Sequence, residues 1–492
     1  AKAGEHRRWY GSHYVLTNFS NNGAEIIASG HGSITGKNNF YKEAISWNRI
    51  ATDHLAFRKI PEGFIPNMGG LCLYPAMRES FNYLLAFLNT KVAEMQLNVI
   101  NPTMSFPPGT INSLGCKKCP EYNNLISSLV NDNINIAQLN WDSAELSWDF
   151  QHHPLMRLKL AGAYAWGDKP PVMRLASAYN AWKLECEGRF EKLKANEEEL
   201  NRIFIDIYGL QDELTPDVTD KDVTVHRIFD TKDDVPESMQ GSSYVRTKRD
   251  EIVSLLSYAV GCMFGRYSVD VDGLAYAGGD WDDGKYKTFL PDRDGILPIT
   301  DEEYLEDDII SRLCDWLKAA YGADTLEENL DFIAGALGGK GNSSREIIRN
   351  YFLKDFFKDH CKTYQKRPIY WLFDSGKQNG FKALIYLHRY TPDTIGNLRV
   401  DYLHKMQRVY ESEINRMQDM IDHSTNAREV AASTKRKEKL QKQLKECRDY
   451  DEMIAHLALS RIELDLDDGV KVNYEKIQTA SDGKKYAVLA KI

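Results

Sequence analysis

The sequence predicts an α+β protein. A mixed α/β domain comes first, followed by a mostly helical region with a small β-hairpin and a coiled-coil-like helical hairpin at its end. Three observations predict this class. Short aromatic and β-branched runs between glycines fill roughly the first 115 residues. Apolar residues recur at helical spacing through most of the chain from residue 172 onward. Two β-rich runs flank the turn Asp374-Ser375-Gly376.

Composition limits the possible classes of protein. The chain has 492 residues, enough for several domains, and its 42% hydrophobic content is typical of folded cores. We find no run of about 18 apolar residues and no signal-peptide pattern, so we expect no membrane segment. The eight scattered cysteines favour reduced thiols and a cytoplasmic location. A net charge of −9 argues against binding nucleic acid over the whole surface, but it permits a local basic face.

The N-terminal elements follow from local patterns. Residues 10–16 and 40–47 have the aromatic content of strands, and residues 81–92 place apolar side chains at helical spacing. A polar helix is expected over 121–140. A long helix rich in Glu and Lys then covers 172–207, and residues 212–245 are acidic and resemble a surface linker.

The C-terminal elements are mainly helical. Residues 246–263 and 302–361 predict helices, and the β-hairpin follows near residue 370. From residue 400 to about 459, apolar residues alternate steps of three and four, with a polar break at 423–426. Two long helices joined by a short polar turn predict an antiparallel helical hairpin.

These elements suggest four parts. A mixed α/β domain is expected over residues 1–155, and a long helix with an acidic linker over 156–245. A helical domain with the β-hairpin is expected over 246–398. The helical hairpin and a C-terminal tail occupy 399–492.

The segment 37–59 is the best candidate for DNA reading, because it interleaves basic and aromatic residues. Six residues are candidates for DNA binding: Lys37, Arg49, Arg58, Lys59, Trp47 and Phe57. The four cations would contact DNA, and the two aromatic residues would hold their loops. The alternative is a β-rich core with solvated charges, since aromatic strands usually belong to a core.

A second basic segment runs from Lys340 to Lys382. It has ten Lys and Arg residues, which suits the neutralisation of phosphates. An ordinary solvated helix face explains the same pattern equally well.

Several strings carry a resemblance to a known family. Trp9-Tyr10-Gly11, residues 40–47 and Pro61-Glu62-Gly63-Phe64-Ile65 resemble the target-recognition domain of adenine-specific methyltransferases that fuse recognition and modification in one chain. Residues 329–334 and Lys366-Arg367-Pro368-Ile369-Tyr370-Trp371 resemble the C-terminal half of the PglX family, the methyltransferases of BREX phage-exclusion systems. On this resemblance, residues 1–155 are identified as a target-recognition domain.

The resemblance implies a site-specific enzyme that transfers a methyl group from S-adenosylmethionine to the exocyclic amine of adenine. Its implied partners are double-stranded DNA, an N-terminal methyltransferase domain and other phage-defence subunits. The chain opens on Ala1, and we expect it to be the DNA-recognition and C-terminal portion, with the catalytic domain absent.

No catalytic or cofactor-binding residue is predicted in this chain. The family's Asn-Pro-Pro-Tyr/Phe motif has its nearest match at Asn101-Pro102-Thr103-Met104, which lacks the second proline and the aromatic ring. The glycine-rich run 335–341 lacks phosphate-loop spacing.

No metal site is predicted either. Cys116 and Cys119 form half of a zinc pattern, and free thiols are the favoured interpretation, with metal binding left open. The rival hypothesis for the whole chain is a non-catalytic interaction module that binds protein partners of a defence complex.

Overall fold

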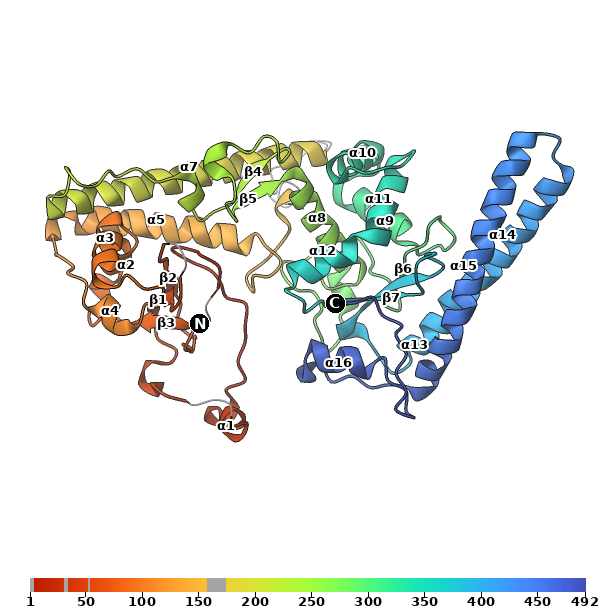
Figure 1. Ribbon diagram of the computed structural model, residues 1–492, viewed down its shortest axis with the longest axis horizontal. Coiled ribbons are helices and arrows are strands. Elements are labelled where there is room, and N and C mark those ends of the chain that lie inside the picture. The colour runs from red at the N-terminus through yellow and green to blue at the C-terminus, as the bar shows by residue number, and fades with distance from the viewer. Residues whose placement is uncertain (1–3, 31–33, 52–53, 157–173) are drawn as a thin grey trace. The chain divides into compact units, whose positions relative to one another are not determined.

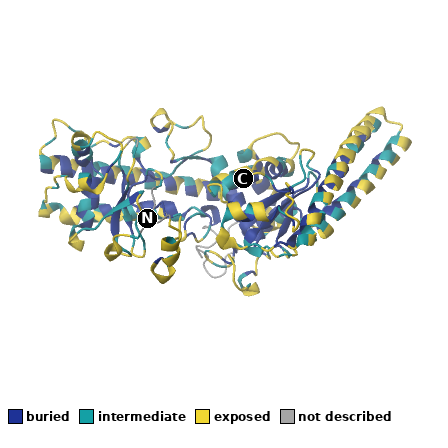
Figure 2. Ribbon diagram, turned by 60° about the horizontal axis from the view of Figure 1, so that its bottom comes forward, coloured by how far each residue is buried: buried dark blue, intermediate teal, exposed yellow. Residues whose placement is uncertain are grey.

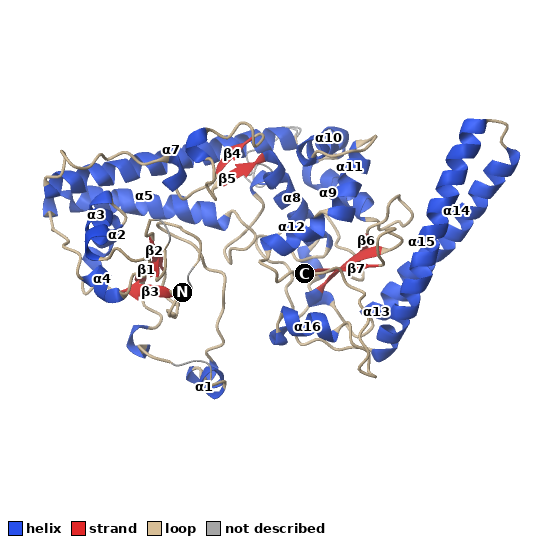
Figure 3. Ribbon diagram, viewed as in Figure 1, coloured by secondary structure: helices blue, strands red, loops and turns tan. Residues whose placement is uncertain are grey.

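The computed structural model describes residues 4–30, 34–51, 54–156 and 174–492. Within these ranges the chain forms two compact units. Unit 1 comprises Ala1–Phe150 and Tyr179–Lys248, and unit 2 comprises Gln151–Ala178 and Arg249–Ile492. Small sheets among many helices confirm the predicted α+β class (Figure 3). None of the helices in the described ranges is both long and apolar enough to cross a membrane.

Unit 1 is built around a three-stranded antiparallel sheet. Its strands are β1 (Ala44–Asn48), β2 (Phe57–Ile60) and β3 (Gly70–Leu73), in the order β2-β1-β3. A second, two-stranded parallel sheet pairs β4 (Arg227–Phe229) with β5 (Val245–Thr247). The helices of this part of the chain are α1 (Ala24–Ala28), α2 (Phe81–Leu88), α3 (Lys91–Ile100), α4 (Pro108–Asn112), α5 (Asn123–Asp142) and α7 (Leu175–Tyr208) (Figure 1).

Helix α7 belongs to the core of unit 1, which explains why residues 179–248 join that unit. Its buried Phe190, Leu193 and Phe204 lie in one hydrophobic cluster with Trp9 and Leu85. The four-part division expected from the sequence therefore differs from the two units. Residues 179–245, which the sequence predicts as part of a separate segment, belong to unit 1.

Two local predictions in unit 1 are wrong. Residues 10–16 form no strand, because Gly11 and Ser12 take positive φ values of 113° and 66° and turn the chain. The segment 212–245 is not a surface linker, since Val223, Val225 and Met239 are buried in the core of unit 1. The many acidic residues between these apolar positions give the segment a polar composition, which led to the prediction of a linker.

The helix predicted over 81–92 is present, but it is divided into α2 and α3. Asn89 ends α2, and its side chain bonds both backbone groups of Phe57 in β2. Oδ1 accepts from the Phe57 N–H at 3.0 Å, and Nδ2 donates to the Phe57 carbonyl at 3.0 Å. This pair fixes the helix pair to the sheet.

Unit 2 contains the predicted hairpin of β7 (Tyr370–Asp374) and β8 (Lys382–Tyr386), which is confirmed. A third strand, β6 (Ile296–Pro298), pairs with β8 and gives the antiparallel order β6-β8-β7. The helices that start in or run into unit 2 are α8 (Lys248–Met263), α9 (Ile309–Tyr321), α10 (Leu326–Leu337), α11 (Ser344–Lys354), α12 (Phe356–Thr363), α13 (Thr394–Asn397), α14 (His404–His423), α15 (Ala427–Ser460) and α16 (Val470–Lys476).

Helices α14 and α15 form the predicted antiparallel hairpin, and Figure 1 shows that it projects from the rest of unit 2. Met406, Tyr410 and Met417 of α14 are buried, as their heptad spacing predicts. Figure 2 shows the other faces of the projecting part as mostly exposed.

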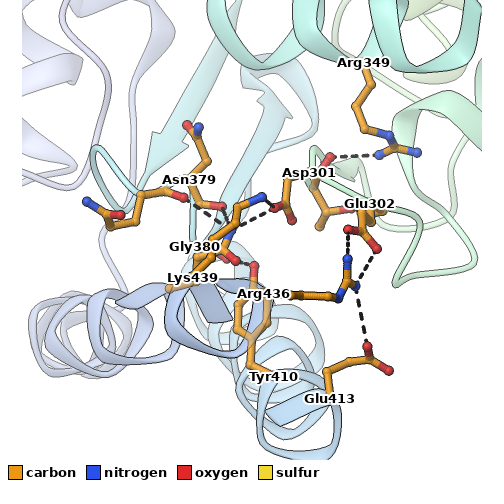
Figure 4. A network of polar contacts seen from close by, with 12 residues as sticks. Asp301, Glu302, Arg349, Asn379, Gly380, Tyr410, Glu413, Arg436 and Lys439 are labelled. Atoms are coloured by element: carbon orange, nitrogen blue, oxygen red, sulfur yellow. Dashed lines mark hydrogen bonds and ion pairs between the residues drawn. The ribbon is translucent and has the colours of Figure 1, made fainter. Parts of the chain in front are cut away.

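A polar network attaches the root of the hairpin to unit 2 (Figure 4). Arg436 of α15 forms ion pairs with Glu302 and with Glu413 of α14, and Lys439 pairs with Asp301. The Tyr410 hydroxyl donates to the Gly380 carbonyl at 2.8 Å. These bonds join both helices of the hairpin to the loops of the β6-β8-β7 sheet.

Candidate nucleic-acid interface

Trp47 and Phe57 lie on neighbouring strands in the core of unit 1. They are 1% and 0% exposed, and their ring centroids are 5.8 Å apart. The Trp47 indole N–H donates to the Phe106 carbonyl at 2.9 Å. The Phe106 N–H in turn bonds the Arg49 carbonyl at 2.7 Å, so Trp47 fastens the chain beside Arg49. This placement suits the loop-holding role expected for it.

Arg58 is buried, with 1% exposure, and does not present its guanidinium to solvent. Its Nη2 donates to Asn48 Oδ1 at 3.0 Å, and Asn48 Nδ2 donates to the Gly4 carbonyl at 2.8 Å. Burial, with a smaller contribution from Arg7, lowers the pKa of Arg58 to about 10. From this position Arg58 orders the N-terminal segment. The direct DNA contact predicted for Arg58 therefore does not agree with the burial of its side chain.

The other three predicted cations differ in accessibility. Lys37 and Arg49 are exposed, and no ion pair is recorded for either within the described ranges. Lys59 is half-buried and pairs with Glu43 at 2.7 Å, with its ammonium 5.9 Å from the centre of the Phe81 ring. Lys37 and Arg49 are therefore the predicted cations with charge available to a phosphate.

A groove of about 780 Å³ lies in unit 1, in the size range of small-ligand sites. We call it the aromatic groove. Six of its lining residues have aromatic carbocyclic or indole rings: Tyr14, Phe19, Phe40, Tyr41, Phe64 and Trp148. The groove is not apparent from the sequence, because its walls come from separate loops. Of its aromatic lining residues, Phe40 and Tyr41 are the two that lie inside the candidate DNA-reading segment 37–59.

The rings of the aromatic groove form two clusters. Phe19 packs edge-on against Phe40, with centroids 5.5 Å apart. Phe64 stacks on Trp148 at 6.0 Å with an interplanar angle of 13°. Tyr41 connects the clusters, because its N–H donates to the Phe64 carbonyl at 2.9 Å and its carbonyl accepts from Gly63 at 3.0 Å.

Two buried polar residues line the groove beside these rings. Ser12 and His13 are 5% and 7% exposed, yet the Ser12 hydroxyl and His13 Nε2 have no hydrogen-bond partner among the described residues. Burial first, then the charges of Arg58 and Arg7, lower the pKa of His13 to about 4. The imidazole is thus neutral at pH 7, and Nε2 is able to donate or accept according to its tautomer.

Exposed cations flank the groove along the chain. Lys37 lies in the sequence between the lining residues Thr35 and Phe40. Lys42 directly follows the lining residue Tyr41. The Arg49 N–H donates to the carbonyl of Gly69, another lining residue, at 3.0 Å. Flat rings beside free positive charge are the elements that bind nucleic acid strands.

Three cations of the second basic segment form ion pairs inside unit 2. Arg349 is buried and pairs with Asp308 at 2.8 Å, and Arg345 pairs with Glu327 at 2.6 Å. Lys382 pairs with Asp374 across the β7–β8 hairpin at 2.6 Å. These three charges hold the fold and are not available to phosphates. Six other cations of the segment are exposed and have no ion pair among the described residues: Lys340, Lys354, Lys362, Lys366, Arg367 and Lys377. Phosphate binding and a solvated helix face therefore both stay predictions for that segment.

Cys116 and Cys119 are half-buried free thiols. Burial raises the pKa of Cys116 to about 11, which keeps it protonated at neutral pH. The described ranges contain no group of three or more His, Cys, Asp or Glu side chains placed to hold a metal ion.

No family model matches the chain. It is 40% identical over 490 residues to the adenine-specific methyltransferase PglX of Lacticaseibacillus casei (strain Zhang), an alignment that covers 97% of this chain and 38% of that protein. It is 33% identical over 492 residues to the adenine-specific methyltransferase BrxX of Escherichia coli O9:H4 (strain HS), covering 97% of this chain and 39% of the relative. The chain spans less than two-fifths of the length of either relative. The resemblance inferred from its motifs is confirmed: almost the entire chain is similar to a part of the PglX and BrxX methyltransferases.

Proposed function

We propose that this chain is the DNA-recognition and C-terminal portion of a site-specific adenine methyltransferase in phage defence, and that unit 1 binds duplex DNA. The observation that carries the proposal is the pairing of exposed Lys37 and Arg49 with the aromatic groove of unit 1. Similarity to proteins named as adenine-specific methyltransferases supports the choice of DNA as the ligand.

In this proposal some residues contact DNA directly and others support them from the interior. Lys37 and Arg49 contact phosphates, and Lys59 does so when it leaves Glu43. Trp47, Phe57 and Arg58 act from the interior by holding the strands and loops that carry those cations. S-adenosylmethionine belongs to the methyltransferase as a whole, and no residue of this chain is assigned to it.

Salt-dependent binding tests the proposal. Each phosphate neutralised on duplex DNA contributes about −0.9 to the slope of log K against log salt concentration. The double variant Lys37→Gln/Arg49→Gln should bind a labelled duplex more weakly, with the slope smaller in magnitude by about 1.8. Fluorescence anisotropy of the full chain over a salt series measures both quantities.

The matched control is Lys192→Gln/Lys232→Gln, which removes two exposed charges of unit 1 outside the segment 37–59. It equals the first variant in net charge, so it reports only the general field of the protein. Equal slopes for the two double variants would contradict the assigned contacts. An affinity independent of salt would contradict DNA binding by this chain.

A second candidate function is protein-partner binding by the α14–α15 hairpin. The projection of this hairpin from the rest of unit 2, with mostly exposed faces, favours it (Figure 2). Salt-insensitive association of the chain with another defence subunit would support this second function. Removal of residues in the projecting part would then abolish the association and leave DNA affinity unchanged.

A further inference from the structure

The aromatic groove has features that duplex phosphate binding does not use. Its two ring clusters, Phe19 with Phe40 and Phe64 with Trp148, line a groove of about 780 Å³, which has room for a flat ring. Stacking on aromatic side chains requires an unpaired base with a free face, because bases inside a duplex stack on one another. The geometry therefore fits a base that has left the helix.

The buried polar atoms of the groove point to the same ligand class. Buried hydroxyls and ring nitrogens in folded proteins nearly always have hydrogen-bond partners. The Ser12 hydroxyl and His13 Nε2 have none among the described residues, although both side chains line the groove and are more than nine-tenths buried. The polar edge of a nucleobase supplies donors and acceptors to both, which a purely apolar ligand does not.

The distribution of charge indicates a base carried in a strand. None of the lining residues in the described part of the chain is an Asp, Glu, Lys or Arg, so the interior suits a neutral ring. Positive charge lies outside, on the neighbouring Lys37, Lys42 and Arg49. A nucleotide within DNA has this division, with a neutral base and charged phosphates on either side of it.

We propose that the aromatic groove of unit 1 binds one unpaired nucleobase of the bound DNA, stacked against Phe64 and Trp148 and hydrogen-bonded by Ser12 and His13. This inference rests on the proposed function and names the form of DNA that the same surface prefers. Unit 1 then senses an extruded or unpaired base beside the duplex that its cations hold.

The experiment uses the full chain and three probes. One is a matched duplex, the second is the same duplex with a bulged 2-aminopurine, and the third is the free 2-aminopurine nucleotide. The bulged duplex should bind about tenfold more tightly than the matched duplex, and its fluorescence should fall as the base stacks. The free nucleotide should bind far more weakly, because it has no flanking phosphates for the cations.

Two variants assign the effect to the groove. Trp148→Leu removes one stacking face, and His13→Phe keeps a ring but removes the unpartnered nitrogen. Both should abolish the preference for the bulged duplex and leave the affinity for the matched duplex unchanged. His13→Phe should not lower the melting temperature, because it removes a buried polar atom that has no partner. Leu184→Ala, at an exposed apolar site on α7, is the control.

The outcomes separate the two proposals. Equal affinity for both duplexes without a fluorescence change would overturn the base site and leave duplex binding intact. Equal binding of the free nucleotide and the bulged duplex would overturn a base carried in DNA in favour of a free nucleotide. Loss of the preference in Leu184→Ala would also overturn the assignment to the groove. Failure to bind either duplex would remove the proposed function as well.

Discussion

Glu197 is a buried carboxylate that ties the N-terminal segment to α7. Its side chain is 3% exposed, and Oε2 lies 2.9 Å from Arg8 Nη1. The Trp9 indole N–H donates to Oε1 at 2.6 Å. An ion pair at this depth stabilises the fold only as a complete set, because either charge alone would be buried without a partner.

Glu197→Ala should therefore destabilise the chain by about 3–5 kcal/mol, since it leaves Arg8 charged in the core. Urea unfolding followed by tryptophan fluorescence measures the change. Glu199→Ala, which breaks the exposed pair with Arg202 on the same helix, should change stability by no more than about 0.5 kcal/mol. The double variant Arg8→Met/Glu197→Leu should recover much of the stability that Glu197→Ala loses. If the double variant is destabilised as much as Glu197→Ala, the explanation is refuted.

His360 of α12 is held in its neutral form by the strand beside it. Its Nε2 accepts from the N–H groups of Ile369 and Tyr370 at 3.2 and 3.1 Å, so that nitrogen has no room for a proton. Burial, together with Arg266, lowers the pKa of His360 to about 3. The folded pKa lies below that of the unfolded chain, so this contribution to stability is present above about pH 6.5 and decreases as the pH falls toward 3.

The free energy of unfolding should thus decrease by about 3 kcal/mol from pH 7 to pH 4 through this histidine alone. His360→Gln offers a carbonyl oxygen to the same two N–H groups without a titration. Its urea unfolding should show a flatter pH profile than the parent chain. His423→Gln, at the exposed end of α14, is the control. If the free energy of unfolding of His360→Gln depends on pH as steeply as that of His423→Gln, His360 is not the cause.

At the scale of elements, long periodic segments were predictable from sequence and short or buried ones were not. Helices α5 and α7 and the hairpin of α14 and α15 repeat an apolar face over many turns, so local spacing was sufficient. Strand β6 has three residues and exists because β8 offers a free edge. The pattern of residues 294–300 contains nothing that distinguishes it from a loop.

The candidate site shows the same limit. Trp47 and Phe57 were predicted to support loops, and their burial agrees with that role, whereas the depth of Arg58 was not visible in its sequence context. The sequence around a basic residue in a strand does not indicate whether its side chain faces solvent or, as in Arg58, bonds a neighbour such as Asn48. Ser12, His13 and Trp148 were missed because two segments far apart in the sequence, one at residues 12 and 13 and the other at residue 148, meet at one groove. Nothing along the chain indicates that proximity.

The turn between β7 and β8 packs against α15 of the helical hairpin, and Gly380 permits this close contact. A Cβ at Gly380 would lie 2.7 Å from the Gln443 carbonyl oxygen of α15, closer than packed atoms allow. The Gly380 N–H donates to Glu446 of the same helix at 3.0 Å, so the turn has no freedom to retreat. The close approach depends on the missing side chain.

Gly380→Ala should destabilise unit 2 by about 1–3 kcal/mol, because the added methyl pushes the turn off α15. Proteolysis of the full chain should then cut the hairpin faster than in the parent. Gly335→Ala is the matched control, since Gly335 lies exposed in α10 with no atom within 4 Å of the added methyl group. That control should leave unit 2 unchanged or stabilise it by up to about 1 kcal/mol. Equal effects of the two variants would contradict the packing argument.

At the scale of the whole molecule, the two units divide the candidate functions. Unit 1 has the aromatic groove with the exposed Lys37 and Arg49, whereas unit 2 uses charges such as Arg349 and Arg436 to hold its own helices. We propose on this basis that DNA binds to unit 1 and that a protein partner binds to the α14–α15 hairpin of unit 2. These assignments place the two ligands on different stretches of the chain.

Hydrogen–deuterium exchange of the full chain, with and without a duplex, tests this division most directly. The central claim predicts slower exchange in residues 35–50 and 63–69 of unit 1 when DNA is bound, and unchanged exchange along α14 and α15. Protection confined to the hairpin, with residues 35–50 and 63–69 unchanged, would contradict it and make the hairpin the DNA-binding element.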